Sequence, residues 1–249
     1  MTKLLTLLFL LLTSPAWGAF AEVGAGSQRA SGAQYAADNT AVAFPGNVAS
    51  GNLLVALGVI GDGNGSADLD VTCDDSITTS YSVLLSADFD GSKKLFVAYG
   101  VSGSAAANTV TCTITGGGGG TKSIGFAIDE FSGQHATPLD TDGGQSTGTS
   151  TDPADSLTTG VANTLIVGIV THKNATNPTI TPTGSYIQIA EDEDYDADSV
   201  AFNVVYRIAT AATSYTVDWT LGASTLWSVY TASFQPTVTN KKVQVIIVE

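Results

Sequence analysis

The feature that most constrains the fold of this chain is an internal repeat of strand-like segments. GNLLVALGVI, which begins at Gly51, matches ANTLIVGIVT, which begins at Ala162, with an offset of 111 positions. NTVTCTIT matches YTVDWTLG with an offset of 107, and AIDEFSG matches TASFQP, aligned on Phe131 and Phe234, with an offset of 103. Matches that keep their order while the offset drifts predict a tandem duplication with changes in loop length.

Each repeat is predicted to be a series of short strands, because β-branched and aromatic residues alternate with Gly, Asn, Asp and Ser clusters. The first repeat has these expected strands: Thr40–Phe44, Asn52–Ile60, Leu69–Cys73, Tyr81–Ser86, Lys94–Val101, Thr109–Thr115 and Ser123–Phe131.

The pattern predicts an all-β fold, an antiparallel β-sandwich of jelly-roll-like type. We expect residues 19–236 to form one pseudo-two-fold sandwich from the repeats 20–130 and 131–236, since no Pro/Ser-rich hinge separates them. The alternative is two tandem immunoglobulin-like sandwiches, because each repeat is long enough for one.

The N-terminus has the pattern of a secretory signal peptide over residues 1–18. Lys3 is followed by an apolar run, Leu4–Leu12, and by the small-x-small sequence Ala-Trp-Gly that ends at Gly18. The apolar run is too short to span a bilayer comfortably, and no later segment is long and apolar enough to do so. We therefore expect a secreted protein, extracellular or periplasmic; the alternative is a retained anchor.

The C-terminal residues 237–249 fall outside the repeat. Val243, Val245 and Ile247 alternate along this tail, which predicts an additional strand. Such a strand either covers an edge of its own sheet or pairs with a neighbouring subunit, so self-assembly through residues 241–249 is one hypothesis.

The charge balance argues against nucleic-acid binding. Without Lys3 the chain has eight basic and 23 acidic residues, a net charge of −15, and no Lys/Arg cluster. Such a surface repels phosphate backbones. Disorder is not expected either, because 43% of the residues are hydrophobic.

The two cysteines, Cys73 and Cys112, both lie in Val-Thr-Cys segments with strand character. In an oxidising compartment they are expected to form a disulfide that closes a loop of 39 residues. Two buried free thiols are the alternative.

The five glycines of TCTITGGGGGTKSIGF raise the question of a phosphate-binding loop. A Walker-type loop needs Gly before its Lys and a helix after it, whereas here Thr121 precedes Lys122 and a strand-like run follows. The corresponding linker of the second repeat, LGAST, is four residues shorter. The glycine run is therefore interpreted as a long, pliable connection between strands.

The candidate acidic and amide ligands lie in three predicted loop segments, residues 62–70, 88–90 and 194–196. Oxygen ligands at alternate positions of a glycine-rich loop suit Ca²⁺, although the spacing is not that of an EF-hand. The alternative is solvated acidic loop tips. The candidate calcium ligands are Asp62, Asn64, Asp68, Asp70, Asp88, Asp90, Asp194 and Asp196.

Other chemistry-bearing residues give weaker signals. His135 and His172 are expected in surface loops, without the further ligands that zinc requires. No G-x-S-x-G motif is present. Trp219 and Trp227 lie on predicted strands at core-like positions, so a sugar-stacking surface is not indicated.

The ordered segments SGNLLVALGV, YGVSGSAAANTVTCTITG, FAIDEFSGQHATPLDT, ANTLIVGIV and YRIATAATSYTVDWTLGASTLWSVYTASFQP cover most of the chain from Phe20 to Pro236. This set resembles a loosely defined family of secreted or phage-associated bacterial β-sandwich modules. The resemblance implies a non-enzymatic role in surface structure or adhesion, and it transfers no catalytic residue. We expect any partner to be a surface glycan or a protein.

Two other functions are kept as hypotheses. The first is a carbohydrate-binding module assisted by calcium, which requires exposed aromatic side chains in a strip or groove. The second is a hydrolase, which requires a carboxylate or histidine pair inside a cleft. No cofactor is required by the structural or adhesive function.

Overall fold

The structure is a computed structural model that describes residues 16–63, 68–173, 178–192 and 201–239. Within these residues the regular structure is β-strand, apart from one short 3-10 turn, η1 (Val23–Gly26). All strand pairings in the described part are antiparallel. The predicted all-β antiparallel sandwich is confirmed. No helix in these ranges is long and apolar enough to cross a membrane.

Strands β2 to β10 form the N-terminal half and strands β11 to β18 form the C-terminal half. The N-terminal half contains β2 (Ala21–Glu22), β3 (Ala30–Tyr35), β4 (Asn39–Val48), β5 (Leu53–Asp62), β6 (Asp70–Asp75), β7 (Ser82–Leu85), β8 (Lys93–Val101), β9 (Ala106–Thr115) and β10 (Lys122–Ser132). The C-terminal half contains β11 (Gln134–Ser150), β12 (Ala154–Thr158), β13 (Thr164–Lys173), β14 (Ile180–Pro182), β15 (Ile187–Asp192), β16 (Phe202–Ala209), β17 (Ser214–Leu221) and β18 (Thr225–Pro236). Two short strands flank the halves, β1 (Ala16–Trp17) and β19 (Val238–Thr239).

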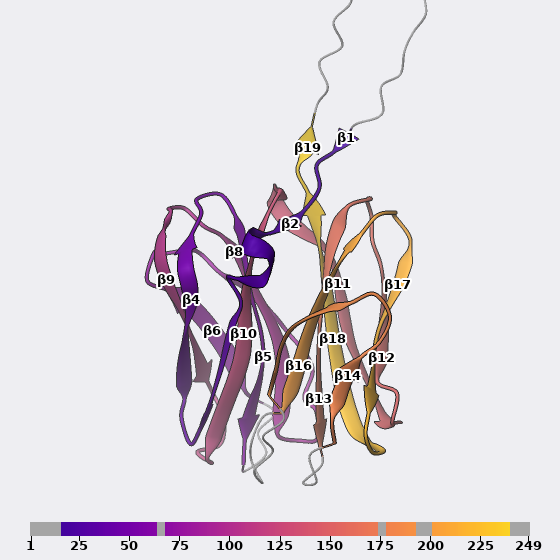
Figure 1. Cartoon of the computed structure of the whole chain (residues 1–249). Coiled ribbons are helices and arrows are strands. Elements are labelled where there is room, and N and C mark those ends of the chain that lie inside the picture. The colour runs from indigo at the N-terminus through magenta and orange to yellow at the C-terminus, as the bar shows by residue number, and fades with distance from the viewer. Residues whose placement is uncertain (1–15, 64–67, 174–177, 193–200, 240–249) are drawn as a thin grey trace, which may run out of the picture.

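The strands form four layers (Figure 1). In the N-terminal half, a sheet in the order β2-β10-β5-β8-β7, with β3 also paired to β10, packs on the sheet β4-β9-β6. In the C-terminal half, the sheet β11-β18-β13-β16-β15 packs on the sheet β12-β17-β14. The two larger sheets face each other in the middle, and the two three-stranded sheets lie outside (Figure 1).

Three apolar cores hold these layers together. One core lies inside the N-terminal half, around Phe96 and Phe126. A second core lies inside the C-terminal half, around Trp219. A third core joins the two larger sheets and contains residues of both halves, among them Phe131 and Phe234; we call it the joint core.

The position of each layer explains its hydrophobic pattern. All ten residues of β5 are buried, and so is every residue of β13 except Lys173, because both strands are covered on both faces. Burial alternates along most of β9, where Val110, Cys112 and Ile114 face the core. Continuous apolar runs therefore mark the middle layers, and alternating runs mark the outer ones.

We expected one sandwich built from both repeats, with two tandem sandwiches as the alternative. Each of these hypotheses describes part of the observed arrangement. Each half is a two-sheet sandwich with its own core, as in the alternative. The halves then share the joint core, as a single pseudo-symmetric body requires.

The two halves have the same strand order. The order β3-β10-β5-β8-β7 corresponds to β11-β18-β13-β16-β15, and β4-β9-β6 corresponds to β12-β17-β14. This agreement supports the tandem duplication, which itself stays a prediction.

The strand register changes one detail of the sequence alignment. Phe131 lies opposite Leu53, whereas Phe234 lies opposite Leu165, so β5 and β13 correspond with an offset of 112 rather than 111. A shift of one residue would turn every side chain to the other face of the sheet. In agreement with 112, the left-handed backbone at Gly51 (φ 84°) recurs at Asn163 (φ 61°).

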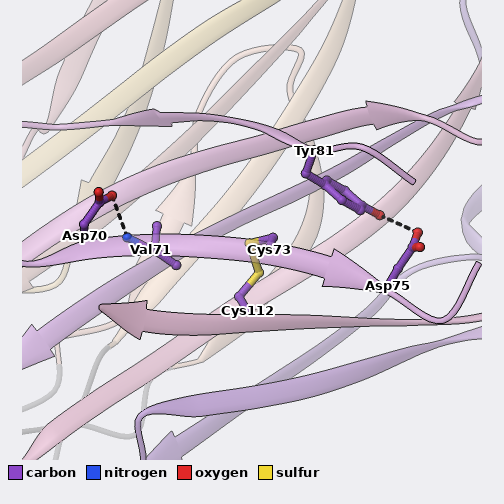
Figure 2. Close-up of a disulfide and its surroundings, with 6 residues drawn as sticks. All are labelled: Asp70, Val71, Cys73, Asp75, Tyr81 and Cys112. Carbon is purple, nitrogen blue, oxygen red and sulfur yellow. Dashed lines mark hydrogen bonds between the residues drawn. A yellow bond between two sulfur atoms is a disulfide. The ribbon is translucent and has the colours of Figure 1, made fainter. Parts of the chain in front are cut away.

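The expected disulfide joins Cys73 of β6 to Cys112 of β9 (Figure 2). The two residues lie directly opposite each other in neighbouring strands, with Cα atoms 4.1 Å apart. Cys112 is buried in the N-terminal core, at the place that Trp219 takes in the C-terminal core. The bond therefore reinforces the outer sheet of one half only.

Removing this disulfide is expected to destabilise the protein. The chain-entropy model for a loop of this length gives a loss of roughly 3–4 kcal/mol in the free energy of unfolding. Guanidinium unfolding of the Cys73→Ala/Cys112→Ala variant measures this loss, with reduced wild-type protein as the control. Equal unfolding midpoints for the oxidised wild type and the variant would contradict it.

Candidate functional site

The most concentrated group of charged side chains lies at the junction of the two halves. Arg29, which precedes β3, forms ion pairs with Glu22 of β2 and with Asp129 of β10. Its Nη1 donates to the main-chain oxygen of Gln188 at 2.7 Å, and its guanidinium lies over the ring of Tyr206, 5.2 Å from the centroid. Gln188 and Tyr206 belong to β15 and β16, so one arginine links the two larger sheets.

A hydrogen bond between the two halves completes this group of residues around Arg29. The hydroxyl of Tyr206 donates to Glu22 Oε2 at 2.9 Å. Burial raises the pKa of Tyr206 to about 12, and the hydrogen bond to Glu22 adds to this effect. The tyrosine is therefore a permanent donor at physiological pH.

Asp129 is fully buried, and its pKa is shifted. Burial, with a contribution from the nearby Glu22 carboxylate, raises this pKa to about 7. The backbone N–H of Glu130 and the guanidinium of Arg29 oppose this shift. Two carboxyl groups thus compete for one arginine, and the arrangement can hold a proton between the halves.

The neighbouring Glu130 faces the other side of β10. Its Oε1 accepts hydrogen bonds from the Ala49 N–H and from Asn52 Nδ2, each at 2.7 Å, and so fixes the turn that leads into β5. Its Oε2 is buried without a hydrogen-bond partner in the described part of the chain. This carboxylate is part of the fold of the N-terminal half.

The glycine run approaches the first predicted calcium ligand. Asp62, at the end of β5, is buried, and its Oδ2 accepts a hydrogen bond from the Gly118 N–H at 3.0 Å. Gly117 has a φ of 87°, and a Cβ atom there would lie 2.7 Å from the same oxygen. The glycine run thus lies against a carboxylate of its own chain, and it connects β9 with β10 as expected.

Of the other predicted ligands, the structure describes Asp68, Asp70, Asp88 and Asp90, which lie between β5 and β8 in the sequence. Asp68 and Asp70 are exposed, and Asp70 Oδ1 accepts from the Val71 N–H at 2.7 Å. Asp88 is also exposed, and partial burial of its carboxyl raises its pKa.

Asp90 contacts the other half of the protein. It forms an ion pair with Lys173 at the end of β13 and has a left-handed backbone with a φ of 63°. The junction of the halves is therefore bridged by charged side chains both here and at Arg29.

The structure does not gather the predicted calcium ligands into one site. Asn64, Asp194 and Asp196 lie outside the described residues. In the part that is described, no group of three or more His, Cys, Asp or Glu residues is placed to hold a metal ion. Calcium binding at these loops stays a prediction.

The histidine expectation is wrong for His172. This residue lies in β13 and is fully buried, because the strand continues through Lys173 and pairs with β18. Burial lowers the pKa of His172 to about 4, and the nearby charge of Lys93 adds to the effect, so the imidazole is neutral at physiological pH. His135 lies at the start of β11, where its Nδ1 contacts Thr137.

Both tryptophans are core residues, as expected. Trp219 donates its Nε1–H to Asn203 Oδ1 at 2.9 Å, and Trp227 donates to Ser150 Oγ at 2.9 Å. Neither presents a flat exposed ring, since they are 1% and 8% exposed.

The Arg29 group was missed from the sequence. Its one usable signal is the pair Asp129–Glu130 inside the apolar strand GFAIDEF. Acidic residues on a strand buried on both faces require partners, because an unpaired buried charge is costly. Arg29 and Glu22 lie about a hundred positions away, so the partners could not be identified from local pattern.

No family model and no curated protein matches the chain.

The raised pKa of Asp129 predicts a pH dependence of stability. The folded protein holds this proton more tightly than the unfolded chain, in which Asp titrates near pH 4, so the free energy of unfolding falls as the pH rises from about 4 to 7. The effect is a few kcal/mol at most, since one pKa unit is worth about 1.4 kcal/mol. Asp129→Asn is expected to remove this part of the fall in guanidinium unfolding measured between pH 4 and 8.

The exposed Asp74, also on a strand, provides the matched control. Asp74→Asn should leave the pH dependence of the wild type unchanged. Parallel curves for wild type and Asp129→Asn would show that Asp129 does not carry the coupled proton.

Proposed function

We propose that the chain is an exported, non-enzymatic structural or adhesive protein that contacts its partners through loops and sheet edges. The observation that carries this proposal is the way the two halves are joined into one body. An apolar joint core is supplemented by Arg29 and by the Asp90–Lys173 ion pair. A body of this kind suits the transmission of load and the rigid display of loops.

The disulfide supports the export part of the proposal. Disulfides persist in oxidising compartments and are rare in reducing ones. The bonded pair Cys73–Cys112 therefore fits an extracellular or periplasmic protein. The expected signal peptide, residues 1–18, provides the route.

The buried carboxylates support a structural role for the protein, because their hydrogen bonds are made within the fold. Asp155, for example, is buried and accepts hydrogen bonds from Ser146 and Thr231. Asp62 and Glu130 accept hydrogen bonds from main-chain N–H groups. Each of these three carboxylates is held by donors of the chain itself, while Glu130 Oε2 has no hydrogen-bond partner in the described residues.

A carbohydrate-binding module is the second candidate, and one observation favours it. On the C-terminal half, the guanidinium of Arg207 contacts the half-buried rings of both Tyr186 and Tyr215, 5.7 and 5.0 Å from their centroids. An arginine flanked by two tyrosines offers both hydrogen-bond donors and aromatic surface to a sugar. The buried tryptophans do not add to this surface.

Export is tested by producing the full chain in a bacterial host and measuring the mass of the released protein. The expected product begins at Ala19, because cleavage follows Gly18. Gly18→Tyr places a bulky residue where the protease needs a small one and should prevent processing. A cytoplasmic product that keeps residues 1–18 would contradict the proposal.

The two candidate functions are separated on a glycan array, probed in calcium and again in chelator. A structural protein, or one that adheres through a protein partner, predicts no glycan binding in either condition. Calcium-dependent binding would favour the second candidate, particularly if Tyr186→Ala or Tyr215→Ala abolished it. Ala substitution of the distant exposed Tyr35 is the matched control.

A further inference from the structure

The C-terminal half carries an arginine that is not paired with an acidic residue. Arg207 of β16 is partly exposed, and it forms no ion pair with any residue that the structure describes. The other arginine of the chain, Arg29, pairs with two carboxylates. The chain has 23 acidic and nine basic residues, so a shortage of acids does not explain the difference.

Two tyrosine rings hold the guanidinium of Arg207 in place of a carboxylate. The cation–π contacts with Tyr186 and Tyr215 fix its position, and both rings pack against the C-terminal core. The hydroxyl of Tyr215 is already used, because it donates to the main-chain oxygen of Ala211 at 3.1 Å. The partly exposed guanidinium is therefore the group that a ligand can reach.

The N-terminal half has a carboxylate of its own at the corresponding place. The register with the middle strands places Gly100 at the position of Arg207, and it places Tyr81 at the position of Tyr186. The hydroxyl of Tyr81 donates to Asp75 Oδ2 at 3.3 Å (Figure 2). This tyrosine thus has an acidic partner from within the chain.

The C-terminal half lacks that carboxylate. The register of the outer sheets, continued two residues beyond β14, places Gly184 at the position of Asp75. A Cβ atom on Gly184 would meet no atom closer than 3.9 Å, where Asp218 Oδ1 lies. The hydroxyl of Tyr186 is buried and has no hydrogen-bond partner among the described residues. One half therefore has an internal carboxylate at this place, whereas the other half has a cation.

We propose that Arg207 binds a carboxylate group from outside the chain, at the place where the N-terminal half has Asp75. A guanidinium forms two parallel hydrogen bonds with a carboxylate, which makes arginine suited to this role.

The surroundings restrict the ligand to a single negative charge. Asp218 lies nearby, and the chain has a net charge of −14, so a polyanion would be repelled. The rings of Tyr186 and Tyr215 offer apolar surface beside the guanidinium, which suits the ring of a sugar acid. The carboxylate site stands on its own, whereas a hexuronic acid residue as its source rests on the carbohydrate-binding candidate above.

The test is a nuclear magnetic resonance titration of the ¹⁵N-labelled protein with methyl glucuronide, with the neutral methyl glucoside and with acetate. The chain has two arginines, so the Arg207 Nε–H signal is the one that disappears in Arg207→Gln. Methyl glucuronide is expected to shift this signal and to leave that of Arg29 unchanged, and methyl glucoside should shift neither.

The variants are compared through the backbone amide signals of Tyr186 and Tyr215. Arg207→Gln is expected to raise the dissociation constant for methyl glucuronide at least tenfold, because a charge-assisted pair is lost. Lys122→Gln, which removes the same charge from the N-terminal half, should not change it. Equal unfolding midpoints of the two variants would show that loss of binding is not loss of folding.

The outcomes separate the site from its ligand. Acetate that binds as tightly as methyl glucuronide would support the carboxylate site and contradict a sugar acid as its source. An Arg207 signal that no carboxylate shifts, or an unchanged dissociation constant in Arg207→Gln, would overturn the inference.

Discussion

The structure depends on the burial of two sheets on both of their faces. Strands β5 and β13 have an outer sheet on one side and each other's sheet on the opposite side, and their side chains alternate between two cores. This double burial accounts for their apolar sequences. Gly58 of β5 lies between Phe96 and Phe126 of the two neighbouring strands, and a Cβ there would lie 2.5 Å from the side chain of each. The middle layers leave little room for larger side chains or for charges without partners.

The charged side chains of this interior lie at its margins, where they are paired with opposite charges or hydrogen-bond partners. Arg29 lies between two carboxylates and a tyrosine of the opposite sheet. Burial raises the pKa of Asp129 to about 7, so the charge of this carboxyl depends on pH near neutrality. The contact between the halves is therefore apolar at its centre, and the net charge at its edge depends on the protonation of Asp129.

Much of the fold could be predicted from local pattern, and the limits have physical causes. Local pattern predicts β9, because its apolar residues alternate with polar ones. It also predicts β5, because its apolar run is continuous. Local pattern does not predict the seventeen-residue strand β11, because it is polar and its pairing with β18 is interrupted by three register shifts. The sequence VTHKN predicts a loop at His172, whereas β13 continues to pair with β18 through Lys173. The Arg29 group depends on contacts between segments distant in sequence, which no local pattern reveals.

The two halves have different side chains at the same position of their outer sheets. Where the C-terminal half has the large ring of Trp219, the N-terminal half has the small Cys112 and a covalent link to β6. One half is thus complete as soon as it packs, whereas the other gains its last constraint only when two thiols are oxidised. Under reducing conditions the N-terminal half would lack this covalent link, whereas the packing of Trp219 in the C-terminal half does not depend on oxidation.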